Sequence, residues 1–151
     1  MIRGRRTFLA TALAGAIGLL STSSAHAVKL ISEEEARMPA AAPMVTRGIT
    51  RGPAIRQIQP DPASGPVKSP LALKIAFEAR GGAKIDASSV RVVYLRATPV
   101  DLSERVRTGI SERGLELTGA EVPPGEHEIQ LTLQDTEGRK SSQTIKLNVA
   151  R

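Results

Sequence analysis

The sequence predicts an all-β protein whose globular part is an antiparallel β-sandwich. Three observations lead to this prediction. Aliphatic residues alternate with polar ones over 71–78, 129–133 and 145–149, which is the period of a half-buried strand. Glycine and proline recur between these stretches, as expected for short strands joined by turns. After residue 27, no stretch longer than about two helical turns shows the 3.6-residue period of a helix.

The first 27 residues are predicted to be a cleaved export signal. A basic start is followed by an apolar run from Leu9 to Leu20, and Ala25 and Ala27 supply the small residues that a signal peptidase requires before the cut. Cleavage is expected after Ala27. The alternative is an uncleaved membrane anchor, which is disfavoured because about a dozen apolar residues are too few to span a bilayer. No stable membrane span is expected after cleavage.

Four residues within this signal indicate a particular export route. Arg5, Arg6, Phe8 and Leu9 resemble the twin-arginine pattern R-R-x-F-L, although Ala10 stands where a lysine often follows. An ordinary secretory signal whose arginines happen to adjoin is the alternative. The twin-arginine interpretation implies a periplasmic protein that folds before export, either because it folds quickly or because it carries a partner or cofactor.

Residues 28–49 are predicted to be a flexible, Pro/Ala-rich linker with one possible helical turn. Ser32 and Glu35 have the spacing of a capping box, and Pro39 and Pro43 would end the turn. Adjacent carboxylates on a helical turn point in different directions, so the acidic triplet 33–35 is interpreted as solvated charge rather than a cation site.

The remaining residues, 50–151, are predicted to form the sandwich. The expected extended segments, in chain order, are 55–60, 71–78, 90–95, a stretch at 100–106 that is either a strand or a helical turn, a short strand around Leu115 and Leu117, 129–133 and 145–149. Gly81-Gly82, Pro123-Pro124-Gly125 and Asp135-Thr-Glu-Gly138 are predicted turns, the last of them closing a hairpin. Prolines cluster between 39 and 70, which fits a first strand at a sheet edge.

Composition excludes several classes of function. The chain has no cysteine, so disulfides, thiol catalysis and thiolate metal ligands are ruled out. After cleavage the only aromatic residues would be Phe77 and Tyr94, so platforms for stacking bases or sugars are missing. Three of the 21 basic residues lie in the signal, which leaves a net charge of about +3 with both signs interleaved. Nucleic-acid binding is therefore not expected.

Two stretches carry a family resemblance. Ile85, Asp86, Ser89 and Val90, within GGAKIDASSVRVVYL, resemble the strand start of bacterial immunoglobulin-like modules. The final segment 122–149 is similar to the closing hairpin of immunoglobulin-like and fibronectin-III-like modules, with a Pro-Gly turn, a strand, an Asp-x-x-Gly turn and a last strand. The resemblance covers about residues 50–151 and implies an immunoglobulin-like sandwich; such sandwiches serve many functions.

Periplasmic copper carriers share this small sandwich and closing hairpin, and their metal sites use several histidines. Here His127 is the only histidine after the signal, and Val28 stands at the expected mature N-terminus. Met38 and Met44, the methionines that follow the signal, are the thioethers that could assist it if the fold brought them close to His127. A lone strand histidine is more often a satisfied core or edge residue, because a transition-metal site needs several convergent donors.

No catalytic set is apparent in the sequence, so an enzyme is not expected. His127 is the only candidate base, and its neighbours Glu126 and Glu128 would point to the opposite face of its strand. The candidate serines are Ser88, Ser89, Ser141 and Ser142, none of which sits in a G-x-S-x-G elbow.

Arg105, Arg107 and Arg113, next to Asp101, Glu104 and Glu112, form a mixed-charge cluster. Alternating signs favour a solvated loop over a surface for an acidic partner.

The sequence thus favours an exported, non-enzymatic immunoglobulin-like module that acts through contacts with a protein partner. It would need no cofactor. The alternative is a periplasmic carrier of copper or of a small ligand, with His127 as its only candidate ligand. An exposed edge strand would suit the first function, because its free backbone groups can pair with a partner.

Overall fold

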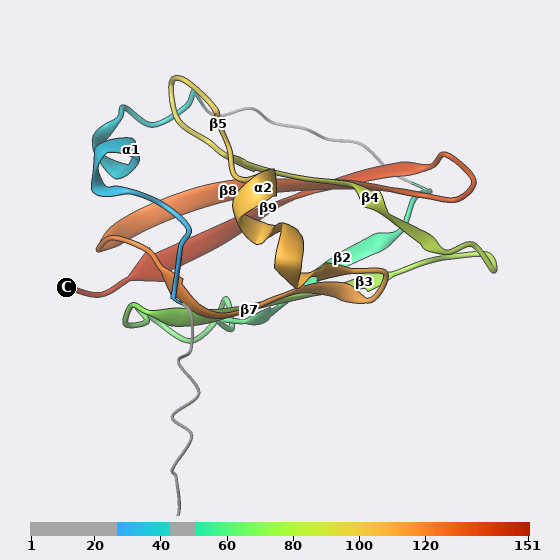
Figure 1. Cartoon of the computed structure of the whole chain (residues 1–151), viewed down its shortest axis with the longest axis horizontal. Coiled ribbons are helices and arrows are strands. Elements are labelled where there is room, and N and C mark those ends of the chain that lie inside the picture. The colour runs from blue at the N-terminus through green and yellow to red at the C-terminus, as the bar shows by residue number, and fades with distance from the viewer. Residues whose placement is uncertain (1–26, 43–50) are drawn as a thin grey trace, which may run out of the picture.

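The computed structural model describes residues 27–42 and 51–151, which fold into two β-sheets packed face to face (Figure 1). One sheet has the strand order β1-β7-β3-β2, with β6 added to β7. Its strands are β1 (Val28–Lys29), β2 (Ala54–Gln59), β3 (Leu71–Glu78), β6 (Ile110–Ser111) and β7 (Gly114–Glu121). The other sheet has the order β5-β4-β8-β9, with strands β4 (Ile85–Tyr94), β5 (Val100–Asp101), β8 (Gly125–Asp135) and β9 (Lys140–Val149). The predicted all-β, two-sheet architecture is confirmed.

The hydrophobic alternation found in the sequence forms the core between the sheets. On β3 the four residues Leu71, Leu73, Ile75 and Phe77 are buried, and the same alternation recurs on β8 and β9. Tyr94 is fully buried at the end of β4. The core is otherwise aliphatic, as the composition requires.

The helices are short. They are α1 (Glu33–Arg37), α2 (Ser103–Val106) and the 3-10 turn η1 (Arg107–Gly109). The capping box predicted for α1 is present, because the Glu35 N–H donates to Ser32 Oγ at 3.2 Å and the Ser32 N–H donates to Glu35 Oε2 at 2.9 Å. Within the described residues, no helix combines the length and the apolar character that crossing a membrane requires.

The expectation of a flexible linker is wrong for residues 28–42. This segment is a strap that closes one open side of the sandwich. Val28 and Lys29 pair in parallel with Ala120 and Glu121 of β7, which joins the strap to the first sheet. The Ala97 N–H donates to the Pro39 carbonyl at 2.8 Å, which joins the strap to the second sheet. Between these attachments, the side chains of Leu30 and Ile31 enter the core.

Other sequence expectations need smaller corrections. The strand expected at 90–95 begins at Ile85 and ends at Tyr94, because Asp86 and Ser89 still pair with the neighbouring β8. The stretch 100–106 contains both expected conformations, first strand β5 and then helix α2. The short strand expected around Leu115 extends over eight residues as β7.

Most of the predicted export signal falls outside the described residues. Arg5, Arg6, Phe8, Leu9 and Ala25 all lie there, as does Met44 of the expected linker. Ala27, after which cleavage is predicted, is exposed and directly precedes β1.

Candidate functional site

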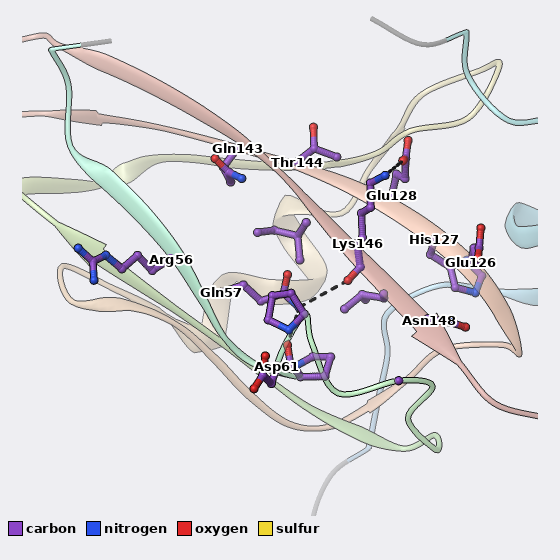
Figure 2. A pocket seen from close by; sticks show the side chains of 15 residues that line it. Arg56, Gln57, Asp61, Glu126, His127, Glu128, Gln143, Thr144, Lys146 and Asn148 are labelled. Atoms are coloured by element: carbon purple, nitrogen blue, oxygen red, sulfur yellow. Dashed lines mark hydrogen bonds and ion pairs between the residues drawn. The ribbon is translucent and has the colours of Figure 1, made fainter. Parts of the chain in front are cut away.

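A groove of about 720 Å³ lies between the edge strands of the two sheets, on the side opposite the strap. β2 is the outer strand of one sheet and β9 the outer strand of the other, and the loop after β2 forms the end of the groove (Figure 2). Its lining combines amides, prolines, charged side chains and buried aliphatic residues: Arg56, Gln57, Pro60, Asp61, Pro62, Gly65, Glu126, His127, Glu128, Gln143, Thr144, Ile145, Lys146, Leu147 and Asn148.

The groove is open because β2 does not pair with β9. The register of β2 on β3 shifts between Gln57 and Gln59, and Pro60 then ends the strand. Gln57 lies at this irregularity and donates its Nε2 amide to the Pro60 carbonyl at 2.6 Å. Ile58, beside it in the chain, is the one large hydrophobic side chain that is exposed (45%) within the described residues. Two sheet edges therefore face each other without forming a continuous sheet.

Strand β9 presents alternate backbone groups to the groove. The Val67 N–H donates to the Asn148 carbonyl at 2.9 Å, so Asn148 faces away from β8. The Lys146 carbonyl accepts from Gln57 Nε2 at 3.5 Å and faces the same way. Because orientation alternates along a strand, Ser142 and Thr144 must also direct their backbone N–H and C=O groups away from β8.

Two charge pairs lie beside the groove, and two further carboxylates of its lining, Asp61 and Glu126, have no ion-pair partner among the described residues. Lys146 Nζ lies 3.3 Å from Glu128 Oε1 on the neighbouring strand, and Arg56 Nε lies 3.4 Å from Glu78 Oε1. Both pairs are exposed, so each contributes little to stability. They leave no free cation in the described lining of the groove, so its unpaired charge is negative.

His127, the candidate metal ligand, is buried (1% exposed) beneath the groove, with both ring nitrogens hydrogen-bonded. Nε2 lies 2.8 Å from the Pro123 carbonyl, and Nδ1 lies 2.8 Å from the Tyr94 hydroxyl. A carbonyl only accepts, so Nε2 carries the proton and Nδ1 accepts from Tyr94. The Tyr94 oxygen in turn accepts from Arg96 Nε at 2.6 Å. The polar network is complete with a neutral imidazole.

The electrostatics of this network agree with its geometry. Burial lowers the pKa of His127, and the nearby Arg96 charge lowers it further, while the bond to Pro123 opposes both. Burial also raises the pKa of the Tyr94 hydroxyl. As expected for a strand, Glu126 and Glu128 are exposed on the face opposite His127. A metal could be bound by His127 only after one of its two hydrogen bonds had broken.

Three of the four candidate serines have hydrogen-bond partners. Ser88 Oγ and Ser89 Oγ donate to Asp86, and Ser142 Oγ lies 3.1 Å from Thr132 Oγ1. Ser141 Oγ is buried without a hydrogen-bond partner among the described residues. In the part of the chain that the structure describes, no three histidine or acidic side chains are grouped to hold a metal ion.

Two arginines of the mixed-charge cluster, Arg105 and Arg107, contact different partners in the structure. Arg105 forms a bidentate ion pair with Glu35 of α1, at 2.8 and 2.7 Å, and also donates to the Leu30 carbonyl at 3.0 Å. Arg107 pairs with Glu104 on the surface. Arg105 therefore holds the strap, and Glu35 is neither a solvated charge nor a cation ligand.

This pair leads to a testable prediction. The hydrogen bond from Arg105 lowers the pKa of Glu35 to about 2, with contributions from Ser32. Replacement of Glu35 by glutamine is expected to lower the free energy of unfolding at pH 7 by roughly 1–2 kcal/mol, because the pair is bidentate and partly buried. The contribution is present above pH 4.5 and is lost as the pH falls toward 2.

Urea unfolding of the wild type and the variant at pH 7 and pH 3 measures this effect. The matched control is Glu34→Gln, an exposed neighbour on the same helix, which should leave stability unchanged. Equal stabilities of the wild type and Glu35→Gln at pH 7 would show that the ion pair does not hold the strap.

Comparison of the chain with models of protein families, with curated proteins and with solved structures finds no match.

Proposed function

We propose that this chain is an exported, non-enzymatic binding or accessory module of immunoglobulin-like type, which acts in the periplasm through contact with a protein partner. The observation that carries the proposal is the groove between β2 and β9, where an edge strand presents unpaired backbone groups beside exposed Ile58. Unpaired strand edges are sites at which another chain can add, so native proteins usually protect them.

Two further observations support the proposal. The Arg5-Arg6-x-Phe8-Leu9 motif and the small residues Ala25 and Ala27 favour twin-arginine export with cleavage after Ala27. Export of a folded protein fits a module that leaves the cell together with a partner. The two-sheet sandwich and its Pro-Gly closing hairpin fit the immunoglobulin-like type.

The copper-carrier alternative gains no support from the site. Its one candidate ligand, His127, already uses both ring nitrogens, and the Tyr94 hydroxyl occupies the lone pair that a metal would need. Without that ligand, the remaining argument for a carrier is the export signal itself.

Site-specific photo-crosslinking tests the proposed function. A photoreactive residue is placed at Thr144, on the edge of the groove, and in a matched control at Glu116, an exposed position of β7 on the other sheet. In the periplasm of the native host, we expect Thr144 to crosslink to a second polypeptide and Glu116 not to do so. Native mass spectrometry of the purified protein should then show the mass of a second chain. A bare polypeptide mass without any crosslink would refute the binding function, and an added mass of a single metal ion would favour the carrier.

A further inference from the structure

We infer that the partner is bound by strand addition: an extended polypeptide segment of about five residues, without acidic side chains, pairs with the outer edge of β9 between Ser142 and Lys146. This inference rests on the proposed binding function and states how the groove is filled. It follows from the free backbone groups of β9, from the contacts at the two ends of this edge, and from the charges beside it.

The free groups lie in the middle of the edge. Thr144 directs its backbone N–H and C=O groups into the groove, and Ser142, at the adjoining end of the same edge beside Gly52, directs its own away from β8; neither residue's backbone has a partner on this side among the described residues. At Lys146 the carbonyl is met only by the side-chain amide of Gln57, at a distance of 3.5 Å. A carboxamide is chemically a peptide group, so the backbone N–H of an incoming strand could replace it at shorter distance.

The chain itself covers both ends of this edge. At the C-terminal end, the Val67 N–H donates to the Asn148 carbonyl at 2.9 Å and the Ala150 N–H donates to the Val67 carbonyl at 2.8 Å. This is a one-residue parallel bridge, so β9 already accepts a short strand here. At the other end, Gly52 approaches so closely that a Cβ would lie 2.6 Å from the Lys140 carbonyl oxygen.

These two contacts define the length of the segment that fits. Five residues, 142–146, remain between the covered ends, which corresponds to about 17 Å of extended chain. A longer strand would collide with Gly52 or displace Val67. The ligand is therefore a short extended segment, such as a chain terminus or a loop.

The surroundings define its chemistry. Ile145 and Leu147 form the apolar floor, so every second side chain of the segment should be apolar. On the outer face, Lys146 is paired with Glu128, and Arg56 is paired with Glu78. An acidic segment would find no free cation in the described lining and would face the unpaired carboxylates of Asp61 and Glu126, so a segment without acidic side chains fits best.

The probe is an acetylated and amidated pentapeptide in which valine alternates with threonine, titrated into the ¹⁵N-labelled protein. We expect the amide signals of Ser142, Thr144 and Lys146 to shift, and their hydrogen exchange to slow at least tenfold. The amides of Gln143, Ile145 and Leu147 face β8 and should exchange slowly with or without the peptide.

A pair of variants at one position isolates the backbone contribution. Thr144→Pro removes an N–H that faces the groove, and proline is tolerated at such edge positions. Thr144→Val changes the same exposed side chain but keeps the N–H. We expect about a tenfold weaker peptide affinity for Thr144→Pro and an unchanged affinity for Thr144→Val. The exchange measurement on the wild type applies even if the proline variant does not fold.

Three results would overturn strand addition: no peptide binding at millimolar concentration, binding without protection of the three amides, or equal affinity of the two variants. Self-association that protects the same amides without peptide would identify a second copy as the occupant and would overturn the assignment to a short segment of a different partner. If a partner crosslinks at Thr144 but the edge amides stay unprotected, strand addition fails while the proposed binding function stands. If no partner crosslinks, the binding function itself fails.

Discussion

Replacement of Leu30 by alanine is expected to lower the free energy of unfolding by about 2–4 kcal/mol. Leu30 is fully buried and Ile31 is 1% exposed, and both belong to the same core cluster as the strand residues of the two sheets. Truncation would remove apolar contacts and leave a cavity between β1 and the second sheet. The loss should be comparable to that of a central core residue, although Leu30 lies in a segment with only two residues of strand.

The matched control is Lys29→Ala, which changes the exposed neighbour on β1 and should alter stability by less than about 0.5 kcal/mol. Urea unfolding followed by circular dichroism measures both variants. If Leu30→Ala were as stable as the wild type, the strap would behave as the flexible linker that the sequence suggests, and its contacts with the core would not persist in solution.

Most strands could be predicted because their signals are local. On β3, β8 and β9 the alternation of aliphatic and polar residues states directly which side chains face the core. The Asp135–Gly138 turn likewise carries its own signature. The Asp135 carboxylate accepts from the backbone N–H groups of Glu137 and Arg139, and the Gly138 N–H donates to the Asp135 carbonyl. Such features depend on neighbours within a few residues.

The strap could not be predicted because its partners are distant in the chain. Leu30 and Ile31 are two apolar residues between Val28-Lys29 and the acidic stretch 33–35. Two residues are too few to show the hydrophobic period of a strand or a helix. Val28 pairs with Ala120, and Glu35 pairs with Arg105, which lies 70 residues away. Proline and charge in 32–43 resemble a linker, although Glu35 in fact anchors the segment.

The groove was equally hidden from the sequence. The order of strands decides that β2 and β9 are both edges and that they face one another, and no local pattern encodes this order. The polar, threonine- and serine-rich outer face of β9 is compatible with an edge, yet β8 has a similar pattern in the interior of the sheet. Nothing in the sequence around Gln57 or Thr144 therefore predicts that they line a groove. The burial of His127, by contrast, matches its interpretation as a strand residue with satisfied hydrogen bonds.

The stability of the protein is expected to fall as the pH decreases from about 7.5 to 5, and His127 is the expected cause. Burial lowers the pKa of His127 in the folded state, whereas in the unfolded chain it is near 6.5. About one pH unit or more above 6.5 the residue is neutral in both states, so its contribution is complete. Below that value only the unfolded chain takes up a proton, and stability declines until the folded pKa is reached, with a slope approaching about 1.4 kcal/mol per pH unit.

Free energies of unfolding at half-unit intervals between pH 7.5 and 5 measure this slope in the wild type and in His127→Gln. Glutamine does not titrate and keeps one donor and one acceptor, so its variant should lose the slope whatever its stability at pH 7.5. Glu35 does not interfere, because its effect falls below pH 4.5. Equal slopes in the two proteins would mean that His127 accepts a proton as easily when folded as when unfolded. The closed hydrogen-bond chain from Arg96 through Tyr94 to His127 would then have to open in the native state, and a ring nitrogen would become free for a ligand.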